Sequence, residues 1–141
     1  MASEELKKLL EIRWANQPDP TGPIEDLRGH ELDPGAVPRP GSSYEYCDAD
    51  GVYCEWVSWE TPSADSVFVY LHGGGYYRSS GPESRMAASN LSKVCDCRCF
   101  TVDYRLAPEN KFPAAIDDVH AAYQWLLKQG VSADRIVVGG S

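Results

Sequence analysis

The sequence of 141 residues has no long apolar run and no signal-like leader. No stretch approaches the roughly 18 consecutive apolar residues that identify a membrane-spanning helix. The first ten residues mix charges with leucines, so they lack the uninterrupted apolar segment of a secretory signal peptide. We therefore expect no membrane span, and we expect a cytoplasmic location.

Positive charge is also scarce, because 21 acidic side chains outnumber 13 basic ones and give a formal net charge of −8. Proteins that bind nucleic acids or anionic membranes use Lys and Arg to neutralise phosphates. The acidic balance therefore argues against both kinds of partner. It keeps the protein in solution and by itself names no ligand.

Cysteine is present in five copies, and none has the paired spacing of a zinc site. We expect Cys95, Cys97 and Cys99 on one face of a strand, with no turn to wrap them around an ion. Cys47 and Cys54 flank a predicted hairpin, and an optional disulfide between them stays open. In a reducing compartment we expect free thiols and no metal site.

One segment stands out against this ordinary composition. Residues 68–75, Phe-Val-Tyr-Leu-His-Gly-Gly-Gly, form an apolar strand that leads into one histidine and three glycines. Glycine leaves its backbone N–H uncovered and adopts dihedrals that other residues avoid. Such amides can point at one developing negative charge, as in the oxyanion hole of lipases and esterases. The plain alternative is a flexible turn after a buried strand.

The N-terminal part, residues 1–42, is predicted to be helical and then irregular. Leucines near helical spacing predict a helix over 4–15 with Ser3 as its N-cap, and a second short helix begins near Thr21. Residues 33–42 are rich in proline and glycine, which predicts a linker. The sequence therefore predicts a helical appendage over 1–42 and a separate core over 43–141.

The core begins with a hairpin around Asp50-Gly51, formed by strands over 43–47 and 52–59. After it, strands alternate with helices, and the predicted elements are a strand over 66–71, a helix over about 81–94, a strand over 97–104, a helix over 113–129 and a strand over 136–138. This alternation implies right-handed crossovers and a parallel sheet, with the hairpin as an antiparallel extension at one edge. We predict a three-layer α/β/α sandwich.

The last predicted strand runs into Gly139-Gly140-Ser141. A nucleophile elbow, Gly-x-Ser-x-Gly, lies at the sharp turn after such a strand. If Gly139 opens the motif, Ser141 is the nucleophile. If Gly140 opens it, Ser141 is the variable position and the nucleophile is the residue after it.

Four blocks in this order resemble the hormone-sensitive-lipase-like carboxylesterases of the α/β-hydrolase fold-3 family. They are His72-Gly-Gly-Gly, Asp103-Tyr-Arg-Leu-Ala-Pro-Glu, Phe112-Pro-Ala-Ala-Ile-Asp-Asp-Val and Asp134-Arg-Ile-Val-Val-Gly-Gly. The resemblance covers residues 66–141, and residues 1–42 resemble the helical cap of that family more loosely. It implies a partial α/β-hydrolase fold that contains the first strands of the sheet.

The resemblance also implies roles for the glycine-rich segment. The backbone N–H groups of Gly74 and Gly75 are the implied oxyanion donors, Gly73 supports the turn, and His72 shapes the segment without acting as a base. Tyr76 and Tyr77 line the substrate pocket or simply pack; both interpretations stay open. Arg105 and Glu109 are implied to brace the loops beneath the site, and we expect Asp117 and Asp118 to stabilise a helix dipole.

The implied activity is serine-dependent hydrolysis of short or medium acyl esters or lactones, without a metal or other cofactor. In the family the strand Arg-Ile-x-x-x precedes Gly-Asp-Ser-Ala-Gly-Gly. Aligning Arg135-Ile136 with it places Gly140 on the first glycine, which favours Ser141 as the residue before the nucleophile. Family members are about twice as long, and their triad acid and histidine lie beyond the position of Ser141.

None of the three histidines, His30, His72 and His120, is placed to activate a serine. We therefore expect the chain to be the N-terminal half of an esterase and to be inactive by itself. A non-catalytic small-molecule-binding module on the same scaffold is the alternative. A dinucleotide-binding domain is disfavoured, because the chain lacks G-x-G-x-x-G on its first strand. The open edge of the last strand invites association, so a homo-oligomer of the intact form stays open.

Overall fold

A computed structural model describes residues 3–15, 19, 21–29, 36–79 and 81–140. Contacts divide the chain into two compact units, residues 1–31 and residues 32–141, and each is described by itself. Two residues of the predicted chemistry, His30 and Ser141, lie outside the described residues. Part of the predicted linker lies outside them as well.

The first unit contains helix α1 (Glu4–Ala15) and helix α2 (Ile24–Gly29). The Ser3 hydroxyl accepts a hydrogen bond from the Leu6 N–H at 3.2 Å, which confirms Ser3 as the N-cap of α1. Among the described residues, no helix has the length and apolar character that crossing a membrane requires.

The second unit is built on a five-stranded mixed sheet. Its strands lie in the order β1 (Ser42–Ala49), β2 (Val52–Trp59), β4 (Arg98–Val102), β3 (Val67–Leu71) and β5 (Ile136–Gly140). Strand β2 is antiparallel to β1 and to β4, whereas β3 is parallel to both of its neighbours. The sheet therefore has the predicted parallel part and the predicted antiparallel edge hairpin.

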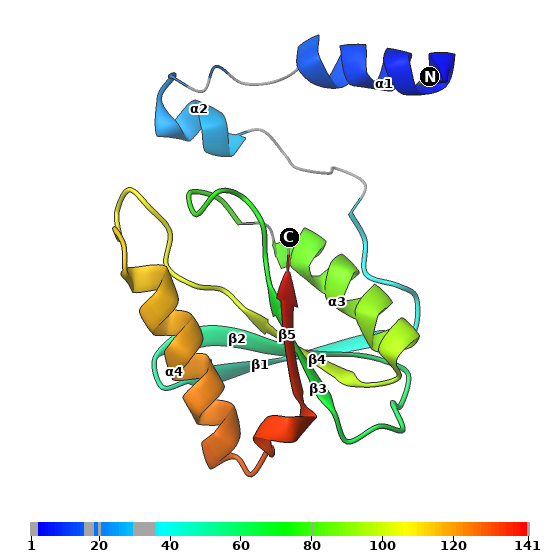
Figure 1. The fold of residues 1–141 in the computed structure, drawn as a ribbon, viewed down its shortest axis with the longest axis vertical. Coiled ribbons are helices and arrows are strands. Elements are labelled where there is room, and N and C mark those ends of the chain that lie inside the picture. Colours follow the sequence, from blue (N-terminus) through cyan, green and yellow to red (C-terminus); the bar gives the residue numbers. More distant parts are fainter. Residues whose placement is uncertain (1–2, 16–18, 20, 30–35, 80, 141) are drawn as a thin grey trace. The chain divides into compact units, whose positions relative to one another are not determined.

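Helix α3 (Gly81–Cys95) and helix α4 (Ala114–Lys128) cover opposite faces of this sheet (Figure 1). A short 3₁₀ helix, η1 (Ala133–Arg135), leads into β5. Successive strand residues point to opposite faces, so Phe100 packs in the core under α4 and Cys99 packs with Ala88 of α3. This arrangement confirms the three-layer α/β/α sandwich.

The expected placement of the three clustered cysteines is wrong. Cys95 ends helix α3, and β4 begins only at Arg98. Asp96 adopts the left-handed conformation with φ of 51°, a common way for a helix to end. The three residues therefore do not share one strand face, although Cys97 and Cys99 are both buried. Directly across the hairpin, Cys47 pairs with Cys54, and both are free thiols.

Candidate active site

A cavity of about 470 Å³ opens where strands β3 and β5 end. The two strands are parallel neighbours, and Leu71 at the end of one pairs with Gly140 at the end of the other. Open α/β sheets place their ligands outside the carboxyl ends of such strands. The cavity is lined by Leu71, His72, Gly73, Gly75, Tyr76, Tyr104, Ala115, Ile116, Val119, Gly139 and Gly140.

The segment after β3, residues 72–78, is here called the glycine loop. Three successive residues have positive φ: Gly74 at 117°, Gly75 at 59° and Tyr76 at 64°. The Gly74 carbonyl accepts hydrogen bonds from the N–H groups of Tyr77 and Arg78, both at 3.2 Å. A Cβ atom on Gly74 would lie 2.2 Å from the Arg78 carbonyl oxygen, so only glycine fits there.

His72 anchors the start of the glycine loop. Its ring is buried and stacks on Tyr104, with 4.0 Å between ring centroids and 12° between planes. The Tyr104 hydroxyl donates a hydrogen bond to the His72 carbonyl oxygen at 2.7 Å. Tyr104, the second residue after β4, therefore holds both the side chain and the main chain of His72.

The end of β5 approaches β3 so closely that a side chain is excluded at Gly140, and at Gly139 it would displace the Phe68 ring. A Cβ atom on Gly140 would lie 2.1 Å from the Leu71 carbonyl oxygen, and one on Gly139 would lie 2.8 Å from the Phe68 ring. Glycine at both positions lets the strand end meet the start of the glycine loop at one cavity. The two glycine-rich motifs of the sequence thus come together in space.

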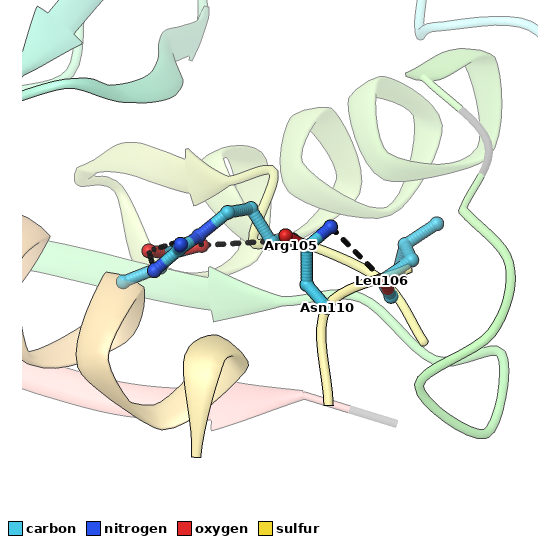
Figure 2. Close-up of polar contacts among 4 residues, drawn as sticks. Arg105, Leu106 and Asn110 are labelled. Atoms are coloured by element: carbon cyan, nitrogen blue, oxygen red, sulfur yellow. Dashed lines mark hydrogen bonds and ion pairs between the residues drawn. The ribbon is translucent and has the colours of Figure 1, made fainter. Parts of the chain in front are cut away.

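The segment after β4, residues 103–113, is here called the supporting loop (Figure 2). Arg105 donates hydrogen bonds from its guanidinium to the Asp118 carboxylate, the shortest at 2.7 Å, and its backbone N–H donates another at 2.8 Å. Burial acts to raise the pKa of Asp118, but these hydrogen bonds outweigh it and hold that pKa below its ordinary value. The Ala107 N–H donates to the Tyr76 carbonyl oxygen at 2.8 Å, which ties the two loops together.

The predicted site residues occupy distinct places around the cavity. Gly73, Gly75 and Tyr76 line it, whereas the Gly74 carbonyl closes the turn of the loop. The Tyr77 ring lies against Gly75, whose ideal Cβ position would be 2.9 Å from a ring carbon. These placements leave the proposed catalytic roles as predictions.

The remaining described histidine, His120, lies on the exposed side of α4. Its Nε2 is 3.5 Å from the Gln124 amide nitrogen, and it does not line the cavity. Asp118, which we expected to serve the helix dipole, instead holds Arg105.

Sequence reasoning missed several residues that shape the site. Tyr104 was placed at the end of a strand without a role, although it contacts His72 and lines the cavity. The first turns of α4 contribute an apolar wall that the sequence did not indicate. The spacing of Ala115, Ile116 and Val119 on one side of a helix is the signal that could have found it.

Comparisons with known proteins agree with this geometry. A family model described as alpha/beta hydrolase fold matches residues 68–141. An acetyl-hydrolase of Streptomyces hygroscopicus is 31% identical to the chain over 99% of the chain and 47% of the relative. The carboxylesterase/phospholipase LipF of Mycobacterium tuberculosis is 41% identical over 55% of the chain and 21% of the relative.

Solved structures show the same likeness. The crystal structure of an esterase from the bacterial hormone-sensitive lipase family is 34% identical, with a TM-score of 0.78 over 99% of this chain and 48% of that one. EstE5, in a crystal soaked with p-nitrophenyl butyrate, is 31% identical, with a TM-score of 0.82 over 99% of this chain and 48% of that one. The chain thus spans about half the length of these relatives. With its fold, its glycine loop and its relatives in agreement, the chain belongs to the alpha/beta hydrolase fold family and is similar to the hormone-sensitive-lipase-like esterases.

Proposed function

We propose that the chain supplies the oxyanion half of a serine carboxylic-ester hydrolase. One observation carries this proposal: the glycine loop and the end of β5 line the same cavity of about 470 Å³. In a serine hydrolase these are the places of the oxyanion donors and of the nucleophile. Had the loop pointed away from the end of β5, the two motifs could not serve one reaction.

The proposed chemistry follows from that placement. The nucleophilic serine stands after Gly140, and Ser141 is the residue before it. Attack on the ester carbonyl forms a tetrahedral oxyanion, which accepts hydrogen bonds from the backbone N–H groups of Gly74 and Gly75. Gly73 supports the turn. The triad acid and histidine come from a part of the intact protein beyond residue 141, and no metal or cofactor is needed.

The apolar lining of the cavity supports the substrate class. Tyr76, Ile116 and Val119 present apolar surface beside the glycine loop, which suits the acyl or alcohol portion of a short or medium ester or a lactone. The relatives named above are hydrolases of esters or acetyl groups, so a non-catalytic binding module is not favoured. A cytoplasmic location and a homo-oligomer of the intact form stay predictions.

The test uses the coding region of the chain together with whatever follows the codon for residue 141. We expect the purified product to hydrolyse p-nitrophenyl butyrate and the 141-residue chain alone to show no such activity. Replacing Gly75 by Ala should lower kcat by about 100-fold or more, because it displaces an oxyanion donor. The matched control is Gly51→Ala, since Gly51 also has positive φ but lies in the hairpin turn with open space around it.

The same protein decides between the two registers of the elbow. Ser141→Ala should leave most of the activity, whereas replacing the residue that follows should abolish it. Absence of hydrolysis by the extended product, or an apolar residue where the triad histidine belongs, would contradict the proposed function.

A further inference from the structure

Behind His72, on the side of the sheet that faces α3, lies a second and smaller pocket of about 180 Å³. We call it the polar pocket; its lining includes His72, Ser79, Asp103, Glu55 and Arg85. Glu55 and Arg85 neutralise each other through two hydrogen bonds of 2.8 and 2.6 Å. His72 lines both this pocket and the cavity of the proposed active site, so its imidazole lies between the two.

The hydrogen bonds of His72 fix which ring nitrogen carries the proton. Its Nδ1 lies 2.7 Å from the carbonyl oxygen of Gly73, which can only accept, so Nδ1 is the donor. In the neutral ring, Nε2 is then an acceptor. This atom is buried, and it has no hydrogen-bond partner among the described residues.

Asp103 faces the same atom at a distance that excludes a direct hydrogen bond. Its Oδ1 lies 3.7 Å from His72 Nε2 and accepts a hydrogen bond from the Ser79 hydroxyl at 2.8 Å. An ionised carboxylate and an imidazole lone pair are both acceptors, so they need a donor between them. A buried acceptor left without a donor destabilises the fold, because it has lost its hydrogen bonds to water.

We propose that the polar pocket binds one ordered water, which donates one hydrogen to His72 Nε2 and the other to Asp103 Oδ1. The pocket has room, because a water molecule takes up about 30 Å³ in the liquid. Its two acceptors, His72 Nε2 and Asp103 Oδ1, supply the polar contacts that a buried water needs. Asp103 is thereby a positioning residue that acts on His72 through this water.

The bridge has a consequence for the glycine loop. His72 Nδ1 holds the Gly73 carbonyl, and the Gly74 N–H belongs to the same planar peptide unit as that carbonyl. In a trans peptide the two groups point in opposite directions, so a fixed imidazole fixes the direction of the Gly74 N–H. A chain of contacts thus runs from Asp103 through the water and His72 to Gly73. It fixes the direction of one proposed oxyanion donor, the Gly74 N–H. The catalytic part of this inference rests on the proposed function, whereas the water and the tautomer do not.

The first test measures the tautomer of His72 in the ¹⁵N-labelled 141-residue chain by long-range ¹H–¹⁵N correlation at neutral pH. We expect a neutral ring with the proton on Nδ1. Asp103→Ala should change the chemical shift of His72 Nε2, because the water that contacts this atom loses its other partner, and Asp103→Asn should restore the wild-type shift because its side chain keeps a polar group beside the water. Asp65→Ala is the matched control, since that carboxylate is 90% exposed and lies outside the pocket.

Three results would overturn the inference. They are an imidazolium or an Nε2-protonated ring in the wild type, unchanged His72 shifts in Asp103→Ala, or a high-resolution crystal structure without a water in contact with both Nε2 and Asp103. The crystal structure of the wild type needs no variant, so it decides whether the water is present even where Asp103→Ala does not fold.

The second test concerns catalysis and uses the extended protein. Asp103→Ala should lower kcat by about tenfold with KM little changed, less than the loss of a whole donor, and Asp103→Asn should recover most of it. If the extended protein hydrolyses no ester while the crystal structure shows the water in contact with His72 Nε2 and Asp103, the proposed function fails and the water bridge stands. If it is active but His72 has another protonation state, the bridge fails alone.

Discussion

The glycine loop and the supporting loop follow neighbouring parallel strands, yet they reach their conformations by different means. The glycine loop takes its shape from its own backbone, with positive φ at Gly74, Gly75 and Tyr76 and hydrogen bonds to the Gly74 carbonyl. The supporting loop takes its shape from side chains, chiefly Arg105 on Asp118. Under the proposed function the glycine loop presents bare amides to a ligand, so side chains cannot cover it, whereas they can cover the loop that supports it.

The two loops also meet, and two hydrogen bonds join main-chain groups of the glycine loop to the segment after β4. The Ala107 N–H donates to the Tyr76 carbonyl oxygen, and the Tyr104 hydroxyl donates to the His72 carbonyl oxygen. The supporting loop thus stabilises the main chain of the glycine loop at His72 and at Tyr76. A substitution that displaces the backbone of the glycine loop should therefore cost more stability than the loss of one side-chain interaction in the supporting loop.

The largest effect is expected from Gly74→Ala, which attacks the backbone-built loop directly. The new Cβ atom would lie 2.2 Å from a backbone oxygen, so the loop has to move rather than a flexible side chain. We expect a loss of about 3 kcal/mol or more in the free energy of unfolding, measured by urea denaturation.

Gly51→Ala separates the clash from the cost of positive φ. Gly51 has φ of 93° with nothing within 4 Å of its ideal Cβ position, so only the conformational cost of about 1 kcal/mol should appear. Equal losses in the two variants would show that the close packing of the glycine loop contributes nothing beyond its dihedrals.

A smaller effect is expected from breaking the side-chain-built loop. Asp118→Ala removes the acceptor of both the Arg105 guanidinium and the Arg105 backbone N–H, and we expect it to cost about 2 kcal/mol. Arg105→Ala keeps the backbone hydrogen bond, and the arginine side chain is 54% exposed, so it should cost less. The same denaturation series measures both, and a greater loss for Arg105→Ala would contradict the assignment of the backbone hydrogen bond.

The same carboxylate contributes to the acid sensitivity of the fold. Burial acts to raise the pKa of Asp118, but the hydrogen bonds from Arg105 lower it below the ordinary value of 3.8. A carboxyl group with a depressed pKa stabilises the fold above its ordinary pKa, and that contribution is lost as the pH falls through the folded-state pKa. Asp118→Asn should therefore flatten the decline of unfolding free energy between about pH 5 and pH 2.

The decline of the unfolding free energy with falling pH should become shallower without disappearing, because a second buried carboxylate, that of Glu55, also has a lowered pKa. Hydrogen bonds from Arg85 lower the pKa of Glu55, against an opposing effect of burial. Glu55→Gln should also reduce the decline of the unfolding free energy at acid pH, by the contribution of Glu55 alone. If the unfolding free energy of Asp118→Asn fell as steeply at acid pH as that of the wild type, the role given to Arg105 would be contradicted.

Local patterns predicted most of the fold and the position of the glycine loop. The apolar run before His72 predicts a buried strand, and consecutive glycines predict a backbone-built turn at its end. Helix and strand boundaries followed from proline, glycine and periodicity to within a few residues; the strand predicted over 97–104, for example, is β4 (Arg98–Val102). These features depend on neighbours in the sequence, so the sequence displays them directly.

Features that depend on distant partners were not predictable. Asp117 and Asp118 look equivalent in the sequence, and only the rotation of α4 about its axis decides which one faces Arg105. Tyr104 acquires its role because the end of β4 lies beside the start of the glycine loop. Asp103 and His72 face each other across 31 positions, and no local pattern encodes their separation.

The smallest effect should come from Asn110→Ala at the far end of the supporting loop. The Asn110 side chain donates to the Leu106 carbonyl oxygen at a long 3.3 Å, while its backbone N–H donates to the same oxygen at 2.9 Å (Figure 2). Because the backbone bond survives the substitution, the acceptor stays satisfied, and we expect a loss of about 0.5 kcal/mol or less. Asn110→Pro is the contrasting variant, since proline removes the backbone donor as well. If the alanine variant cost as much as Asp118→Ala, side chains would hold this loop at both ends; a near-neutral result confines that role to Arg105 and Asp118.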